Sequence, residues 1–88
     1  MKLKSYNPFL NILPTIDLHG FTRDMVKCVL EEFVSDSIKL NNKKIVVIHG
    51  IGSGIIKNEV HELLKKDKRI KKYYLDGFNI GQTIIELN

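Results

Sequence analysis

The spacing of apolar residues along the chain predicts two amphipathic helices. The first begins after Thr22, a predicted N-cap, and ends near Leu40. Its apolar residues recur three or four positions apart, at Val26, Val29, Leu30, Phe33, Val34 and Ile38. The second helix begins after Gly54 and ends near Asp67, with the same spacing at Ile56, Val60, Leu63 and Leu64.

Four other segments have the alternating or β-branched pattern of strands, at Thr15–His19, Lys44–His49, Tyr73–Leu75 and Thr83–Leu87. The continuous run Lys44–His49 is typical of a central strand covered on both faces, which favours parallel pairing with the first strand through a right-handed crossover. The predicted fold is therefore an α/β domain of order βαβαββ, a two-layer sandwich in which a four-stranded mixed sheet packs with two helices.

The length of the chain bounds its domain organisation. Eighty-eight residues leave room for one core, and 43% hydrophobic with 27% charged residues is an ordinary globular balance. We expect residues 15–88 to form one domain and residues 1–14 to form an N-terminal extension. Pro8 and Pro14 interrupt that extension, whose apolar residues Phe9–Leu13 follow neither a helical nor an alternating pattern.

Cysteine content and hydropathy exclude several classes of protein. Cys28 is the only cysteine, so neither an internal disulfide nor a cysteine zinc site can form. The apolar runs are far shorter than the ~20 residues that cross a bilayer, and the first residues do not form a signal peptide. We therefore expect a cytoplasmic protein without a membrane partner.

Candidate chemistry gathers where the first two strands end. If they are parallel, His19 and His49 lie at the same sheet edge, the edge at which open α/β sheets bind ligands. Asp17 shares a strand face with His19. The glycine-rich loop 50–54 exposes backbone N–H groups next to a helix N-terminus, an arrangement that favours phosphate. Two imidazoles, a carboxylate and an anion site together suit phosphodiester cleavage.

Each of these features also has a structural interpretation. A glycine-rich turn is often only a tight connection, and the sequence GIGSG fits neither the dinucleotide-binding nor the P-loop motif. Asp17 could anchor a loop, and His19 could be a satisfied polar residue at a strand end. His61 is followed by Glu62, but Lys65 stands where a zinc motif needs its second histidine, so we predict a surface position for His61.

The charge distribution adds a basic patch. The net charge is +4, and the stretch KKDKRIKK, residues 65–72, holds six of the fourteen basic residues. These side chains either dock nucleic acid or complement the negative end of the second helix dipole. Tyr73 and Tyr74, which follow the patch, are predicted to pack on the sheet and not to stack on bases.

Two motifs make the pattern specific. Ile16-Asp17-Leu18-His19-Gly20 and His49-Gly50-Ile51-Gly52-Ser53-Gly54, separated by an amphipathic helix, resemble the Smr (small MutS-related) domain over residues 15–88. The resemblance implies a fold like the C-terminal domain of translation initiation factor three. It also implies nucleic-acid cleavage, either DNA nicking or RNA cleavage, including cleavage of mRNA on the ribosome.

Carried over to this sequence, the resemblance makes Asp17 and His19 match the catalytic DLH element and His49 the glycine-loop element. We expect phosphate binding at Gly20, Gly50, Gly52, Ser53, Gly54 and Lys57, the last at a position where the family commonly has arginine. Docking of nucleic acid is expected at Lys68, Arg69, Lys71 and Lys72.

The leading hypothesis is an endonuclease in which His19 transfers a proton, Asp17 orients it or binds a divalent metal such as Mg²⁺ or Mn²⁺, and His49 with the loop holds the scissile phosphate. A non-catalytic module that binds nucleic acid or the ribosome is the main alternative. A protein-interaction domain that presents Phe9–Leu13 is a third. The sequence does not distinguish an RNA from a DNA substrate.

Overall fold

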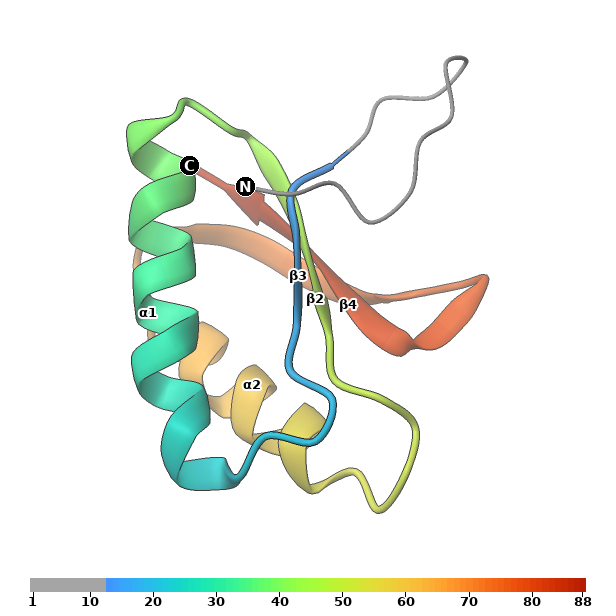
Figure 1. The fold of residues 1–88 in the computed structure, drawn as a ribbon. Coiled ribbons are helices and arrows are strands. Elements are labelled where there is room, and N and C mark those ends of the chain that lie inside the picture. Colours follow the sequence, from blue (N-terminus) through green and yellow to red (C-terminus); the bar gives the residue numbers. More distant parts are fainter. Residues whose placement is uncertain (1–12) are drawn as a thin grey trace.

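The computed structural model describes residues 13–88. Along the chain it contains the strands and helices β1 (Thr15–Asp17), α1 (Arg23–Lys39), β2 (Lys44–Ile48), α2 (Ile55–Lys65), β3 (Ile70–Asp76) and β4 (Asn79–Leu87) (Figure 1). This is the predicted order. Of the expected N-terminal extension, only residues 13 and 14 belong to the described part, so the prediction for the remainder lies outside it.

The four strands form one mixed sheet in the order β1-β2-β4-β3. β1 pairs with β2 in parallel, whereas β4 pairs antiparallel with both β2 and β3. β2 is an interior strand, as its β-branched sequence predicts, and α1 connects it to β1. The prediction of a four-stranded mixed sheet with two helices is confirmed.

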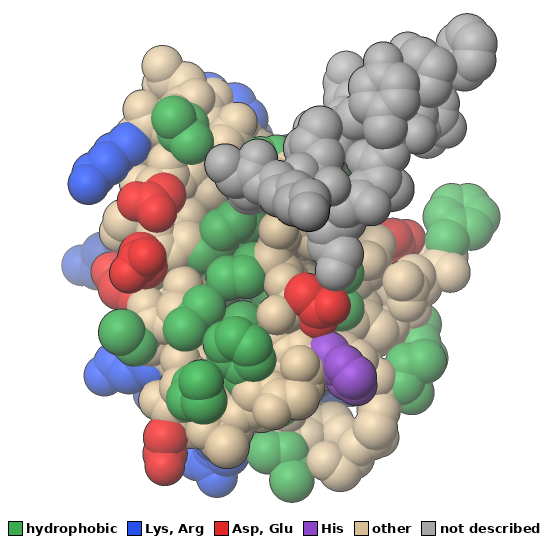
Figure 2. All heavy atoms as spheres, in the orientation of Figure 1, with side chains coloured by type: hydrophobic (Ala, Val, Ile, Leu, Met, Phe, Trp, Pro, Cys, Tyr) green, Lys and Arg blue, Asp and Glu red, His purple; other side chains and the backbone are tan. Residues whose placement is uncertain are grey.

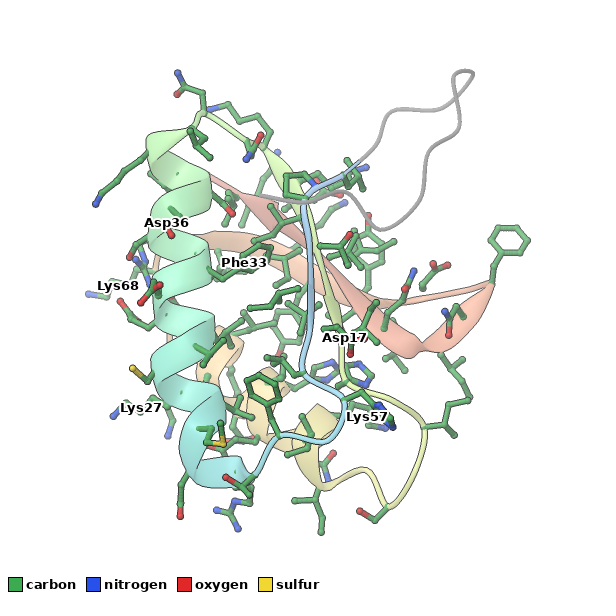
Figure 3. All side chains as sticks on the ribbon, viewed as in Figure 1. Asp17, Lys27, Phe33, Asp36, Lys57 and Lys68 are labelled. Carbon is green, nitrogen blue, oxygen red and sulfur yellow. The ribbon has the colours of Figure 1, made fainter. Side chains whose placement is uncertain are left out.

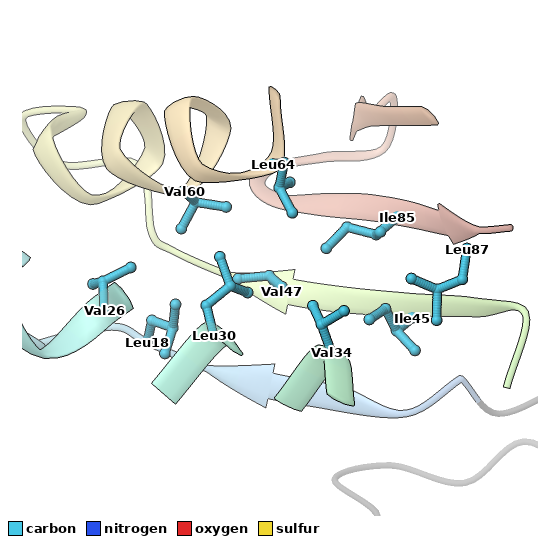
Figure 4. Close-up of a cluster of buried hydrophobic side chains, with 10 residues drawn as sticks. All are labelled: Leu18, Val26, Leu30, Val34, Ile45, Val47, Val60, Leu64, Ile85 and Leu87. Atoms are coloured by element: carbon cyan, nitrogen blue, oxygen red, sulfur yellow. The ribbon is translucent and has the colours of Figure 1, made fainter. Parts of the chain in front are cut away.

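Both helices cover the same face of the sheet, and the core lies between the two layers (Figures 1 and 4). Alternation along β4 shows this arrangement, since Thr83, Ile85 and Leu87 are buried while the residues between them are less so. The core consists of Leu18, Val26, Leu30, Val34, Ile45, Val47, Val60, Leu64, Ile85 and Leu87. In the described part of the chain, no helix covers the opposite face.

Several boundaries differ from the sequence prediction. β1 ends at Asp17 and not at His19, because the chain turns between Leu18 and Phe21. β3 begins at Ile70, inside the basic stretch, so that Lys71 and Lys72 lie on a strand. None of the described helices is long and apolar enough to cross a membrane.

The core position of Ile85 generates a stability prediction. Ile85 is 0% exposed, so truncation to alanine leaves a cavity between the sheet and the helices. We expect Ile85→Ala to lower the free energy of unfolding by about 2–5 kcal/mol. Leu40→Ala is the control, because Leu40 is 68% exposed and its truncation should change stability by about 0.5 kcal/mol at most. Urea unfolding measures both, and equal effects would contradict the assignment of the core.

Candidate functional site at the carboxyl edge of β1 and β2

Parallel pairing brings the ends of β1 and β2 together. Asp17 is paired with Ile48, and the next residue, Leu18, donates its backbone N–H to the Ile48 carbonyl at 2.7 Å. The chain then turns, with Phe21 N donating to Leu18 O at 2.9 Å. Gly20 has φ 86°, which turns of this kind require at their third position and which glycine adopts readily. His19 therefore lies exposed at the corner of the turn.

Asp17 and His19 are close together, and the hydrogen bond between them joins the Asp17 side chain to the His19 backbone. Oδ1 of Asp17 accepts a hydrogen bond from the backbone N–H of His19, with 2.9 Å between the two atoms. In Figure 3 Asp17 lies beside the end of β1, and at the same place Figure 2 shows an acidic side chain next to a histidine. Asp17 thus fixes the turn that presents His19.

The glycine loop begins directly beside this turn. The N–H groups of His49 and Gly50 both donate to the Gly81 carbonyl at 2.9 Å, which fixes the loop to β4. Gly50 has φ 84°, and a Cβ built on it would lie 3.5 Å from Cδ2 of His19. The imidazole of His19 therefore lies against the start of the loop.

The conformational demands of the loop fall on two of its three glycines. Gly54 has φ 83°, like Gly50, and is the N-cap of α2. Gly52 does not have a positive φ, and nothing lies within 4 Å of a Cβ built on it. Gly52 therefore contributes open space above its backbone, where a ligand could approach, and does not contribute a positive φ.

Ser53 and Lys57 flank the start of α2. The Ser53 hydroxyl accepts the N–H of Ile55 at 3.4 Å, and the Gly54 carbonyl accepts that of Asn58 at 2.9 Å. Figure 3 shows Lys57 on the same side of the molecule as Asp17. The positive end of the helix dipole and a lysine thus adjoin the open loop, a combination that attracts anions.

His49 points to the other side of the sheet. It is 5% exposed and continues the strand face of Ile45 and Val47, beneath the helices. Its Nδ1 lies 2.9 Å from the Gly50 carbonyl oxygen and its Nε2 lies 2.8 Å from Oγ1 of Thr83. The sequence predicts that His49 shares one crevice with Asp17 and His19, whereas in the structure both ring nitrogens of His49 lie within hydrogen-bonding distance of protein atoms.

His61 is half-buried and joins the same hydrogen-bonded group. Its Nε2 lies 2.8 Å from Oγ1 of Thr83, its ring centroid is 6.0 Å from that of His49, and it lies against Tyr73. The prediction of a surface position for His61 is therefore wrong. Thr83 was missed, although the alternation of Thr83, Ile85 and Leu87 marks it as an inward-facing hydroxyl that needs a partner.

The chemistry of these atoms determines where the protons lie. The Gly50 carbonyl can only accept, so a neutral His49 carries its proton on Nδ1 and its Nε2 accepts the hydroxyl proton of Thr83. The same hydroxyl oxygen then accepts Nε2–H of His61. We call this chain of hydrogen bonds, from His61 through Thr83 and His49 to Gly50, the histidine relay. It connects α2 and β4 to the first residue of the glycine loop.

The predicted basic patch is divided by the fold. Arg69 donates to both carboxylate oxygens of Asp67, at 2.9 and 2.7 Å, and also to Ser35 and Glu31 of α1. The hydrogen bond from Arg69 lowers the pKa of Asp67. Arg69 therefore ties α1 to the start of β3, although the sequence pattern grouped it with the docking residues. Lys68 lies beside α1, across the molecule from Asp17 (Figure 3).

The suggested metal role of Asp17 finds little support from neighbouring side chains. In residues 13–88, no three His, Cys, Asp or Glu side chains come together in a way that could hold a metal ion.

Taken together, these features define a small α/β domain with an exposed histidine, a carboxylate-fixed turn and an open glycine loop at one sheet edge. The family model for the Smr domain matches residues 16–87. The chain belongs to the Smr domain family. Its fold resembles the Smr domain of Thermus thermophilus MutS2, with a TM-score of 0.83, 22% identity, and coverage of 86% of this chain and 99% of that one.

Further similarities concern the fold in one case and the sequence in two others. YdaL of Escherichia coli, described as a stand-alone small MutS-related protein, has a TM-score of 0.80 at 14% identity, covering 84% of this chain and 63% of that one. The endonuclease MutS2 of Finegoldia magna is 34% identical over 88% of this chain, and that of Caldanaerobacter subterraneus subsp. tengcongensis is 28% identical over 97%. The chain spans 10% and 12% of these two proteins, respectively.

The histidine relay generates a prediction about pH. Burial, followed by electrostatic repulsion from the neighbouring His49 and Lys57 side chains, lowers the pKa of His61. The unfolded chain then binds this proton more readily than the folded domain, so the free energy of unfolding falls as pH drops through the unfolded pKa of about 6.5. His61→Gln retains an N–H donor for Thr83 but does not titrate, and should flatten this dependence. Urea unfolding between about pH 5 and pH 7.5 measures it; an unchanged slope would contradict the relay.

Proposed function

We propose that the domain is an endonuclease that cleaves phosphodiester bonds of RNA or DNA at the carboxyl edge of β1 and β2. The observation that carries this proposal is the position of the exposed His19 ring, 3.5 Å from where a Cβ on Gly50 would lie, which sets a proton-transfer group beside an open anion-binding loop. The names of the MutS2 relatives, endonucleases of which this chain matches about a tenth, support the same reaction class.

In the proposed reaction, a phosphate of the substrate lies over the loop 50–54. Its oxygens are bound by the loop backbone at Gly52, by the N-terminus of α2 and by Lys57, which stabilise the charge that develops on phosphorus-bound oxygen. His19 removes the proton from the attacking hydroxyl or water, whose oxygen bonds to phosphorus while the bond from phosphorus to the leaving oxygen breaks. The leaving oxygen takes a proton from water, and Asp17 holds the backbone of His19 in place. We assign His49 to the support of the loop through its contact with Gly50, and not to proton transfer with substrate.

Docking of the substrate away from the reacting bond is assigned to the exposed lysines of the basic stretch. Lys68 lies beside α1, across the molecule from Asp17, and is left out of this assignment, whereas Lys71 and Lys72 lie exposed on β3. Their charges attract the phosphate backbone whatever its sequence, so affinity should fall as salt rises. Cytoplasmic RNA or DNA, including RNA on the ribosome, would be the partner.

A non-catalytic module that binds nucleic acid or the ribosome is the second candidate. One observation favours it: His49 is buried within the histidine relay, which leaves His19 as the exposed histidine next to the loop. A site with one proton-transfer group binds phosphate as well as a site with two, but it cleaves with less assistance. Incubation with labelled single-stranded RNA and supercoiled plasmid, with and without chelator, distinguishes the two candidates by the presence or absence of product.

The catalytic assignment predicts the effects of two substitutions. His19→Asn should lower the cleavage rate by about 10²–10⁴ because it removes the group that transfers the proton. Asp17→Asn retains an oxygen that can accept the His19 N–H, so it should lower the rate less if Asp17 acts only through the turn. Single-turnover rates at saturating protein measure both effects. Full activity in a folded His19→Asn variant would sink the assignment.

The open backbone at Gly52 gives a separate test of the loop. Gly52→Val introduces neither a clash within 4 Å nor a strained positive φ, so the fold should remain as stable as the wild type within about 1 kcal/mol. Its side chain would occupy the space proposed for phosphate, and affinity for a short oligonucleotide should fall at least about tenfold. Unaltered affinity would mean that the loop is only a connection between β2 and α2.

A further inference from the structure

The face of the sheet opposite the helices has an ordered arrangement of side chains. The strand register sets them in three rows that run across the sheet. The first row, at the candidate site, is Asp17, Ile48 and Gln82. The middle row is Thr15, Val46, Ile84 and Tyr74, and the last is Lys44, Glu86 and Lys72.

The last row is the centre of a lysine cluster, which we define as Lys43, Lys44, Lys71 and Lys72. Three of these lysines line a groove of about 490 Å³ together with Glu86. Lys72 Nζ lies 3.7 Å from Glu86, and all four lysines are exposed. The pKa of Glu86 is lowered first by the hydrogen bond from Tyr74 and then by the positive charges of the nearby lysines. One carboxylate against four ammonium groups leaves this end of the sheet strongly positive, which complements phosphate.

The middle row differs in character from both ends. Val46 is buried, Ile84 is partly buried, and the ring of Tyr74 is 38% exposed with Nζ of Lys72 5.8 Å from its centroid. The accessible part of this row is therefore the Tyr74 ring, with Ile84 beside it, and an aromatic ring next to a basic groove is the pairing with which proteins bind unpaired bases and their backbone.

The two ends of this face are separated by a distance that a short strand of nucleic acid can span. Lys44 and Ile48 are four residues apart on β2, which corresponds to about 13 Å. Stacked nucleotides rise about 3.4 Å each, so about four of them cover this length. A strand with its reacting phosphate beside Asp17 and His19 would therefore place another phosphate at the lysine cluster.

We propose, as a step that depends on the proposed endonuclease function, that this sheet face binds one unpaired strand of nucleic acid. The lysine cluster holds phosphates a few nucleotides away from the bond that is cleaved, and Tyr74 contacts a base between them. Lys43 and Lys44, which lie outside the basic stretch of residues 65–72, are thus assigned to binding. The substrate class is a single strand, because paired bases could not lie on the middle row.

The length of the oligonucleotide tests this path. The wild type and Lys43→Gln/Lys44→Gln are compared by fluorescence anisotropy on labelled single strands of about three and about ten nucleotides. The His19→Asn background keeps the strands intact. The double substitution should weaken binding of the long strand about tenfold and reduce its salt slope by about 0.7 for each lost contact. It should leave the short strand, which the loop alone can hold, within about twofold of the wild type.

A matched control removes the same charge from another face. Lys65→Gln/Lys66→Gln changes two exposed lysines at the end of α2, and should affect both lengths equally and weakly. If the two double variants behave alike, or if a duplex of equal length binds as tightly as the single strand, the path is wrong while the site at the loop stands. If neither length binds to the wild type, the proposed function fails as well.

Tyr74 gives a second readout that does not depend on charge. Tyr74→Phe removes the hydroxyl bonded to Glu86 and keeps the ring, whereas Tyr74→Thr removes the ring and introduces a β-branched residue that is also favoured in strands. We expect the threonine variant to lose about tenfold or more in affinity for the long strand and the phenylalanine variant to retain it, since stacking of a base contributes about 1–3 kcal/mol. Equal affinities for the two variants would overturn the base contact.

Discussion

The parallel pairing of β1 with β2 is the constraint on which the rest of the site depends. β1 has only three residues, yet its register with β2 and the hydrogen bond from Leu18 to Ile48 decide where both strands end. Because the ends coincide, the turn that carries His19 adjoins the loop that begins at Gly50. The buried side chain of Leu18 anchors this arrangement in the core, within the very motif that presents the chemistry.

The histidine relay supports the loop from below. It joins α2, β4 and the end of β2 through one threonine hydroxyl, and it satisfies polar groups that would otherwise be costly to bury. Histidine residues near one sheet edge have divided tasks in this fold: His19 faces outward and His49 holds the backbone of Gly50. Belonging to the Smr family and having its two motifs therefore does not give each motif histidine the same chemical role.

Periodicity predicted the two helices, the four strands and their order. Core residues recur every three or four positions in a helix, as Leu30 does with its neighbours, and every second position in a strand, as Ile85 does. Periodicity could not place His49 relative to Asp17, since their opposite faces follow from the register and from the end of β1. The partners of Arg69 were equally invisible, because Glu31 lies 38 positions away in the sequence. Contacts between distant segments decide whether a charged residue docks a ligand or ties two elements together.

The most direct test of the central claim, that the edge of β1 and β2 binds the phosphodiester, is an amide chemical-shift map. The ¹⁵N-labelled domain is titrated with a short single-stranded oligonucleotide, and the perturbed amides are assigned. The largest shifts should fall on His19, Gly20 and residues 50–56, with none on the opposite side at Lys27. Shifts confined to the groove that Ile16 of β1 forms with Val29 and Phe33 of α1, with the loop unchanged, would contradict the claim.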